Sequence, residues 1–195
     1  RTTHLENFVQ CGKRLTAHLL SCTMDVTTRT GQSTGMGANL PPGTAALCGA
    51  DTEDTNVTKK KIGVLGAGTW GMALARMLCV SGNEVQVWSA LPAEVDSLSA
   101  ARVHPNLPGM KIPAELQFTK SIEEVCTGKD VLLFAVPSVF VRSTTAKARP
   151  YIPDGQILVD VAKGMEPDTL YTMTEVIADE LNREGGPKGV KLVAL

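Results

Sequence analysis

The chain has 195 residues, of which 43% are hydrophobic and 20% charged, and its formal net charge is −1. A chain of this size and composition can bury a sizeable core, which fits one globular domain with an appended segment. A charge so close to zero gives no electrostatic reason to expect nucleic acid or an anionic membrane as a partner. No apolar run reaches the roughly 18 residues that are needed to span a bilayer.

The cysteines of the chain are scattered and form no Cys-x-x-Cys pair: they are Cys11, Cys22, Cys48, Cys79 and Cys126. The histidines do not cluster with them, so neither a zinc site nor a disulfide framework is expected, and we predict no metal. Cys79 and Cys126 fall on apolar faces, which favours buried thiols without a chemical role.

The first 57 residues differ in composition from the rest of the chain. They are rich in Ser and Thr and poor in acids, residues Phe8–Leu20 could form a short amphipathic helix, and the segment 31–49 is rich in Gly, Pro and Ala. This composition is typical of an organelle transit peptide, but a disordered tail or translated sequence upstream of the true start also explains it. Residues 1–57 are therefore expected to be a leader outside the folded domain, and a cytoplasmic or plastid location stays open.

From residue 58 onward, patterns typical of strands and helices alternate. Strands are expected from Lys61 into a glycine turn and over 84–88, 116–119, 131–136, 157–161 and 190–195. Helices are expected after the glycine turn, over 92–98, from 121 to about 127, from Ser138 to Arg149 and over 169–184. Such alternation predicts right-handed crossovers and a doubly wound parallel α/β sheet. Ligands of such sheets bind at the carboxyl ends of the strands.

Short polar residues and glycines predict where several of these helices begin and end. Ser121, Ser138 and Asp168 each precede a helical pattern and are expected to cap it. Gly82 follows the first helix and suits a left-handed position at its C-terminal end.

A Gly-x-Gly-x-x-Gly motif lies between the first strand and the first helix. Gly66 would permit the tight turn, Gly68 would let backbone approach a pyrophosphate, and Gly71 would let the helix pack closely on the strand. The free N–H groups at the start of the helix, together with its dipole, would then face the phosphates. A dinucleotide site is the favoured interpretation, and a purely structural glycine turn is the alternative.

The end of the second strand bears on the choice between NAD and NADP. A carboxylate about 20 residues after the glycines would bind a ribose 2′-OH and favour NAD. The segment 88–91, Trp-Ser-Ala-Leu, has no carboxylate, and Glu94 is expected to lie on the following helix. No arginine stands beside it to attract a 2′-phosphate either, so the sequence permits NADP without requiring it.

Two further residues follow buried strands and are candidates for ligand contact. Phe140 comes shortly after the strand over 131–136 and could press on the dinucleotide; a core phenylalanine is the alternative. Lys163 follows the strand over 157–161 and precedes Gly164, which would let a substrate approach closely; a solvated surface lysine is the alternative.

Taken together, these motifs resemble the N-terminal domain of NAD(P)-dependent glycerol-3-phosphate dehydrogenase. The matching segments, in the order of the family, are Ile62–Gly71, Val85–Trp88, His104–Pro113, Val136–Phe140 and Ala162–Glu166. The Leu-Pro-Gly-x-Lys-Ile-Pro and Lys-Gly-x-Glu stretches distinguish this family from other dehydrogenases that share the glycine turn. Residues 1–57 match nothing in it.

The resemblance implies a Rossmann NAD(P)-binding domain over 58–195 and a reaction that reduces dihydroxyacetone phosphate to sn-glycerol 3-phosphate by hydride transfer. Thr69, Trp70 and Phe140 stand where the family contacts the cofactor, and Lys163 stands where its lysine contacts both cofactor and substrate. Ala90 stands where the family usually has a larger residue against the adenosine ribose, so NAD and NADP both stay open. A homodimer like that of the family is a further expectation.

The chain departs from the family after the strand over 190–195. In the family a Ser-Gly-Pro segment and a helical domain follow, and that domain carries the catalytic lysine. The expectation is therefore a domain truncated at its C-terminal end, with no catalytic residue in this chain and no turnover by the chain alone. A non-catalytic dinucleotide-sensing module and an inactive fragment are the alternatives.

Overall fold

The computed structural model describes residues 58–195. The predictions for residues 1–57, including the leader and the helix over Phe8–Leu20, lie outside the described residues.

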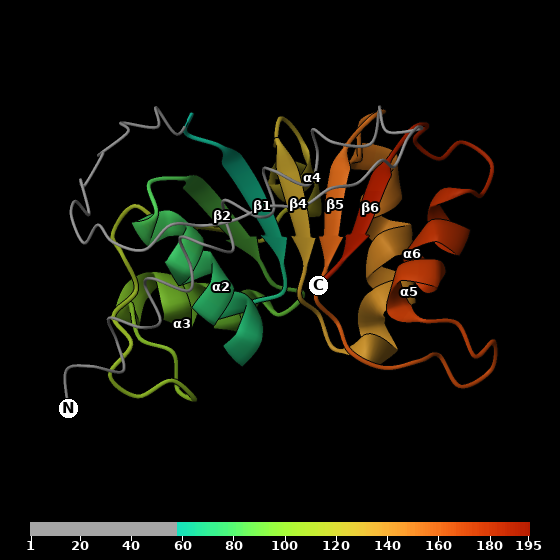
Figure 1. Cartoon of the computed structure of the whole chain (residues 1–195). Coiled ribbons are helices and arrows are strands. Elements are labelled where there is room, and N and C mark those ends of the chain that lie inside the picture. The colour runs from blue at the N-terminus through green and yellow to red at the C-terminus, as the bar shows by residue number, and fades with distance from the viewer. Residues whose placement is uncertain (1–57) are drawn as a thin grey trace, which may run out of the picture.

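The described chain forms one six-stranded parallel sheet in the order β3-β2-β1-β4-β5-β6 (Figure 1). The strands are β1 (Lys61–Leu65), β2 (Glu84–Trp88), β3 (Gln117–Thr119), β4 (Val131–Phe134), β5 (Ile157–Asp160) and β6 (Lys191–Ala194). The helices are α2 (Thr69–Val80), α3 (Pro92–Ala101), α4 (Ile122–Cys126), α5 (Ser138–Ala148) and α6 (Met173–Leu181), and the short 3₁₀ helix η1 (Arg149–Tyr151) follows α5. This is the doubly wound fold that the alternation of patterns predicts.

Helices cover both faces of the sheet, and each face has its own apolar core. The first core includes residues of α2 and α3, such as Met72 and Leu98, and the second joins α4, α5 and α6 to the opposite face. Successive residues of β4 alternate between the two, since Leu133 belongs to the first core whereas Leu132 and Phe134 belong to the second. A strand buried on both faces explains why its sequence is continuously apolar.

The predicted start of the last helix is wrong. Asp168 does not cap it; α6 begins four residues after the expected Thr169, and Leu170, which was expected on its apolar face, is 68% exposed with a φ of 59°. Thr172 is the N-cap instead, because its hydroxyl accepts a hydrogen bond from the Glu175 N–H while the Glu175 carboxylate accepts one from the Thr172 N–H. This reciprocal capping box satisfies donors that Asp168 cannot reach.

The prediction for Ser138 is also wrong in detail. Pro137 occupies the N-cap of α5, Ser138 is already the first helical residue, and no side chain caps this helix. By contrast, the cap of α4 is confirmed, since the Ser121 hydroxyl accepts a hydrogen bond from the Glu124 N–H. Gly82 is confirmed as left-handed, with a φ of 93°.

The two described cysteines are buried, as expected. Burial is the main cause that raises the pKa of both thiols, and it raises the pKa of Cys126 to about 12. Thiols that resist ionisation are poor nucleophiles, so Cys79 and Cys126 contribute packing rather than chemistry.

Candidate functional site

The carboxyl ends of the strands meet at one edge of the sheet, where the arrows of Figure 1 end beside the mark for the C-terminus. Backbone hydrogen bonds tie the loops together there: the Gly66 N–H donates to the Trp88 carbonyl at 2.9 Å, and the Ala135 N–H donates to the Leu65 carbonyl at 2.9 Å. Chain order reverses at this point, because β1 lies between β2 and β4. Such a switch point is where doubly wound sheets bind their ligands.

The glycine turn has the geometry that its motif predicts for packing. Gly66 has a φ of 121°, and a Cβ there would lie 2.6 Å from the Ala135 carbonyl oxygen. At Gly71 a Cβ would overlap the Gly66 carbonyl, so α2 can approach the turn this closely only with glycine. Gly68 differs, since nothing lies within 4 Å of the position of its absent Cβ. Gly68 therefore leaves open space at the surface of the turn, and a phosphate group can approach its backbone there.

The start of α2 presents unused donors beside Gly68. The helical hydrogen bonds begin with the Met72 N–H, which donates to the Gly68 carbonyl at 2.9 Å. The N–H groups of Thr69, Trp70 and Gly71 precede this bond, and α2 has neither a side-chain cap nor an acid in its first turn. The N-terminal end of α2 thus keeps its positive character, which suits an anion.

Two of the predicted contact residues are aromatic and exposed. The side chains of Trp70, in α2, and Phe140, in α5, are 50% and 57% exposed. The alternative that Phe140 is a core residue is therefore wrong. Large exposed aromatic rings at the ligand-facing edge of a sheet suit contact with the flat rings of a nucleotide.

Lys163 lies on the loop that follows β5, at the same edge of the sheet. It is exposed, and its ammonium donates to the Leu195 carbonyl, just beyond β6, at 3.5 Å. The start of this loop is fixed by Asp160, a buried carboxyl that accepts hydrogen bonds from the Ala162 N–H at 2.9 Å and the Thr174 hydroxyl at 3.1 Å. Burial raises the pKa of Asp160, and these hydrogen bonds oppose that effect.

The far end of the same loop is held by Arg142, a residue of α5 that the sequence analysis did not single out. Its guanidinium donates to both carboxylate oxygens of Glu166 at 2.7 Å, and it also bonds to Asp179 of α6 at 2.5 Å. The hydrogen bonds from Arg142, with another from Thr169, lower the pKa of Glu166 to about 2. The last residue of the Lys-Gly-Met-Glu motif is thus a structural anchor, whereas its first residue, Lys163, is exposed and makes one long hydrogen bond.

The end of β2 confirms the expected position of Glu94 and adds a hydrogen bond that was not predicted. Glu94 does lie on α3, but its carboxylate reaches back to the strand end, where Oε2 accepts a hydrogen bond from the hydroxyl of Ser89. Ser89 is only 6% exposed, and its oxygen also accepts the Leu91 N–H at 3.2 Å. The strand end therefore has a carboxylate beside it, which the linear sequence does not reveal.

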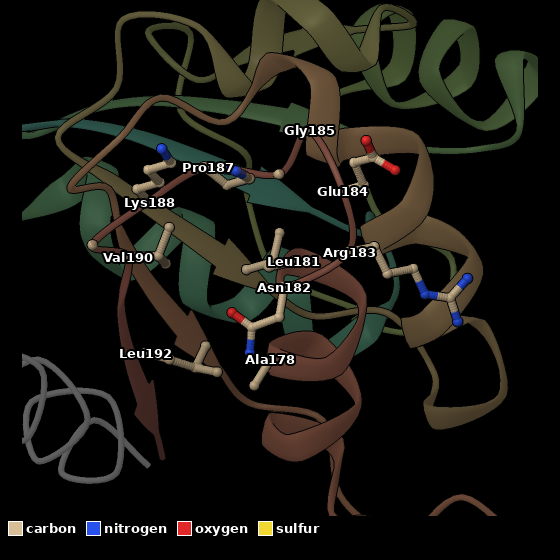
Figure 2. Close-up of a pocket in the computed structure, with 12 residues that line it drawn as sticks. Ala178, Leu181, Asn182, Arg183, Glu184, Gly185, Pro187, Lys188, Val190 and Leu192 are labelled. Atoms are coloured by element: carbon tan, nitrogen blue, oxygen red, sulfur yellow. The ribbon is translucent and has the colours of Figure 1, made fainter.

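A cavity among the described residues lies elsewhere. It has a volume of about 580 Å³ and lies between α6, the loop over 182–190 and β6 (Figure 2). This loop enters the amino end of β6, so the cavity lies at the edge of the sheet opposite the glycine turn. It is not part of the predicted dinucleotide site.

Residues 58–195 lack two features that would indicate other classes of function. In this part of the chain, no helix has the length and apolar character needed to cross a membrane. Nor do His, Cys, Asp and Glu residues gather there in a group that could hold a metal ion.

Comparison with known proteins agrees with this geometry. The sequence model of the family described as NAD-dependent glycerol-3-phosphate dehydrogenase N-terminus matches residues 61–192. A relative from Lactobacillus delbrueckii subsp. bulgaricus, named glycerol-3-phosphate dehydrogenase (NAD(P)+) 2, is 69% identical over 135 residues, which are 69% of this chain and 40% of the relative. A relative from Agathobacter rectalis, with the name glycerol-3-phosphate dehydrogenase (NAD(P)+), is 43% identical over 122 residues, which are 62% of this chain and 36% of the relative.

Solved structures agree as well. The crystal structure of glycerol-3-phosphate dehydrogenase from Coxiella burnetii matches with a TM-score of 0.62 and 29% identity, over 70% of this chain and 40% of that one. The chain thus spans well under half of the length of the proteins that it matches. Because the family model covers most of the described residues, from 61 to 192, the chain belongs to the NAD-dependent glycerol-3-phosphate dehydrogenase family and contains the part that corresponds to its N-terminal domain.

Proposed function

We propose that residues 58–195 bind NAD(H) or NADP(H) and form the cofactor-binding part of an enzyme that interconverts dihydroxyacetone phosphate and sn-glycerol 3-phosphate. The observation that carries this proposal is the glycine turn at the switch point, with open space at Gly68 beside the free N–H groups of Thr69, Trp70 and Gly71. When bound, the nicotinamide supplies or accepts the hydride.

Each predicted contact residue has a part in this proposal. Gly66 and Gly71 shape the turn, and the N–H groups that start α2 donate to the pyrophosphate. Trp70 and Phe140 cover the dinucleotide with their exposed rings, which excludes water from it. Lys163, at the end of β5, donates hydrogen bonds to the cofactor and to the phosphorylated substrate, whose negative charge its ammonium stabilises.

The chain alone is proposed to bind without turnover. The relatives named above extend far beyond the length that this chain covers, since it matches 40% and 36% of their lengths. Formation of a homodimer like that of the family, and a cytoplasmic location, are parts of the same proposal. The relatives named above come from bacteria, and a plastid leader finds no support in them.

The test is a binding titration of the purified 195-residue chain with NADH and NADPH, read by quenching of tryptophan fluorescence. Saturable binding of at least one cofactor is expected, since Trp70 stands beside the turn. A parallel assay follows NADH oxidation in the presence of dihydroxyacetone phosphate, and no turnover is expected. Binding of neither cofactor contradicts the proposal, whereas turnover that Lys163→Ala abolishes contradicts only the part that denies catalysis by the chain alone.

A dinucleotide-sensing module is the second candidate. It is favoured by the same turn geometry, with open space at Gly68 beside the N–H groups that begin α2. It requires tight cofactor binding by this chain without any further domain, so the affinity from the same titration distinguishes the two.

A further inference from the structure

The end of β2 adjoins the glycine turn, which makes it the region where the adenosine ribose of a dinucleotide lies in this fold. β1 and β2 pair in parallel, with Leu65 opposite Trp88, and the Gly66 N–H donates to the Trp88 carbonyl. Ser89 therefore stands directly beside the first glycine of the motif. A polar group at this position meets the ribose rather than the nicotinamide.

The carboxylate of Glu94, in the following helix α3, lies at this position. The hydroxyl of Ser89, itself buried, donates to Oε2 of Glu94, and the Leu91 N–H donates to the same Ser89 oxygen at 3.2 Å. The Glu94 N–H in turn donates to the Leu91 carbonyl at 3.1 Å, and this hydrogen bond forms the turn between β2 and α3. Glu94 is thus fixed at the strand end although it is five residues beyond Ser89.

The charge of this carboxylate is not neutralised by a neighbour. No lysine or arginine of residues 58–195 forms an ion pair with Glu94, and Lys120, which follows β3, is paired with Asp96 at 2.6 Å. The other oxygen of Glu94, Oε1, accepts no hydrogen bond within this part of the chain. One carboxylate oxygen is therefore left for a ligand donor.

We propose that Glu94, positioned by Ser89, accepts a hydrogen bond from the 2′-hydroxyl of the adenosine ribose and so makes the chain select NAD over NADP. A 2′-hydroxyl donates to a carboxylate, whereas a 2′-phosphate brings two further negative charges and no donor. The inference rests on the proposed dinucleotide binding and goes beyond it, because the linear sequence leaves the choice of cofactor open. It replaces the carboxylate that such folds usually have at the strand end itself.

The test measures the affinities of the 195-residue chain for NADH and NADPH in the same buffer, for the wild type and for three variants. Glu94→Gln keeps the size of the side chain and an oxygen for Ser89 but removes the charge. Ser89→Ala removes the hydroxyl that positions Glu94. Glu115→Gln removes an exposed charge just before β3, at the amino ends of the strands, and is the control.

We expect the wild type to bind NADH about tenfold more tightly than NADPH or better, which corresponds to roughly one repulsive charge contact. Glu94→Gln should reduce that ratio about tenfold, chiefly by tighter NADPH binding, and Ser89→Ala should reduce it to a smaller degree. Glu115→Gln should leave it unchanged. Because the discrimination is Coulombic, it should also weaken as salt is raised.

The outcomes separate this inference from the proposed function. If the wild type binds NADH and Glu94→Gln does not change the ratio, or changes it no more than Glu115→Gln does, the inference is wrong and the proposed function stands. If the wild type prefers NADPH, the inference is also wrong. If neither cofactor binds a chain whose thermal unfolding remains cooperative, both fail.

Discussion

The substitution Gly68→Ala, which adds one methyl group, should affect the proposed cofactor binding without lowering the stability of the fold. Its φ of −65° and ψ of 176° are available to alanine, and nothing lies within 4 Å of the position that a Cβ would take. A glycine-to-alanine change at a compatible position stabilises a protein by about 0.4–1 kcal/mol, because the unfolded chain loses conformational freedom. Gly68→Ala is therefore expected to unfold at the wild-type temperature or slightly above it.

The same methyl group is expected to weaken binding strongly. It would occupy the open space through which a pyrophosphate reaches the N–H groups of Thr69, Trp70 and Gly71. Loss of one hydrogen bond to a charged group costs about 1.5–3 kcal/mol, which is a decrease in affinity of roughly 10- to 150-fold. Calorimetric titration with NADH measures this decrease, and thermal unfolding of the same samples measures stability.

Gly71→Ala is the matched control, because there the added methyl group should disturb packing rather than cofactor binding. A Cβ at that position would overlap the Gly66 carbonyl and come within 3.2 Å of the Ala135 Cβ, so this variant should lose stability before it loses binding specifically. The reasoning is refuted if Gly68→Ala binds NADH as the wild type does, or if it unfolds as easily as Gly71→Ala.

Three further predictions concern the loop after β5 and the helix α6. Lys163→Ala should leave thermal stability unchanged, since the ammonium makes only one long hydrogen bond, at 3.5 Å. The same variant should weaken NADH binding measurably in the calorimetric titration. An unchanged affinity would show that Lys163 is a surface lysine without a role in binding. Thr172→Ala should destabilise the chain by about 1 kcal/mol through loss of the capping box, as measured by urea unfolding. Asp168→Ala should have little effect in the same measurement. Equal losses of stability in the two variants would contradict the assignment of Thr172 as the N-cap. Because the fold lowers the pKa of Glu166 from 4.5 to about 2, its ionised form stabilises the folded state above pH 4.5, and this contribution is lost as the pH falls toward 2. Glu166→Gln should therefore flatten the fall in urea midpoint over that range, and an identical pH profile in both proteins would contradict the assignment of Arg142 as its partner.

Most of the fold could be predicted because each buried strand has a strong local pattern. The run over Val131–Phe134 is apolar throughout, and Glu84–Trp88 is bounded by turn residues. The start of α6 was a different case, since two residues that suit an N-cap, Asp168 and Thr172, lie close together. The Thr-x-x-Glu spacing of Thr172 and Glu175 was the signal that could have decided between them.

The candidate site could be predicted where the chemistry lies within one segment, as in the glycine turn. It could not be predicted where two segments meet. Arg142 bonds to Glu166 across 24 positions, and nothing in the pattern around Arg142 indicates a partner. Glu94 is closer to Ser89 in sequence, but only the turn between strand and helix brings its carboxylate back to the strand end.

The loop that carries Lys163 is fastened at both ends, and this determines how its cation can respond to a ligand. Asp160 holds the backbone at Ala162, and Arg142 holds the other end at Glu166 while also binding α6. Between these fixed points only Lys163, Gly164 and Met165 remain, and Gly164 has a φ of 116° that other residues rarely adopt. The backbone conformation of this loop is therefore fixed before any ligand arrives. The Lys163 ammonium can then adjust to a ligand only by rotation about the bonds of its own side chain.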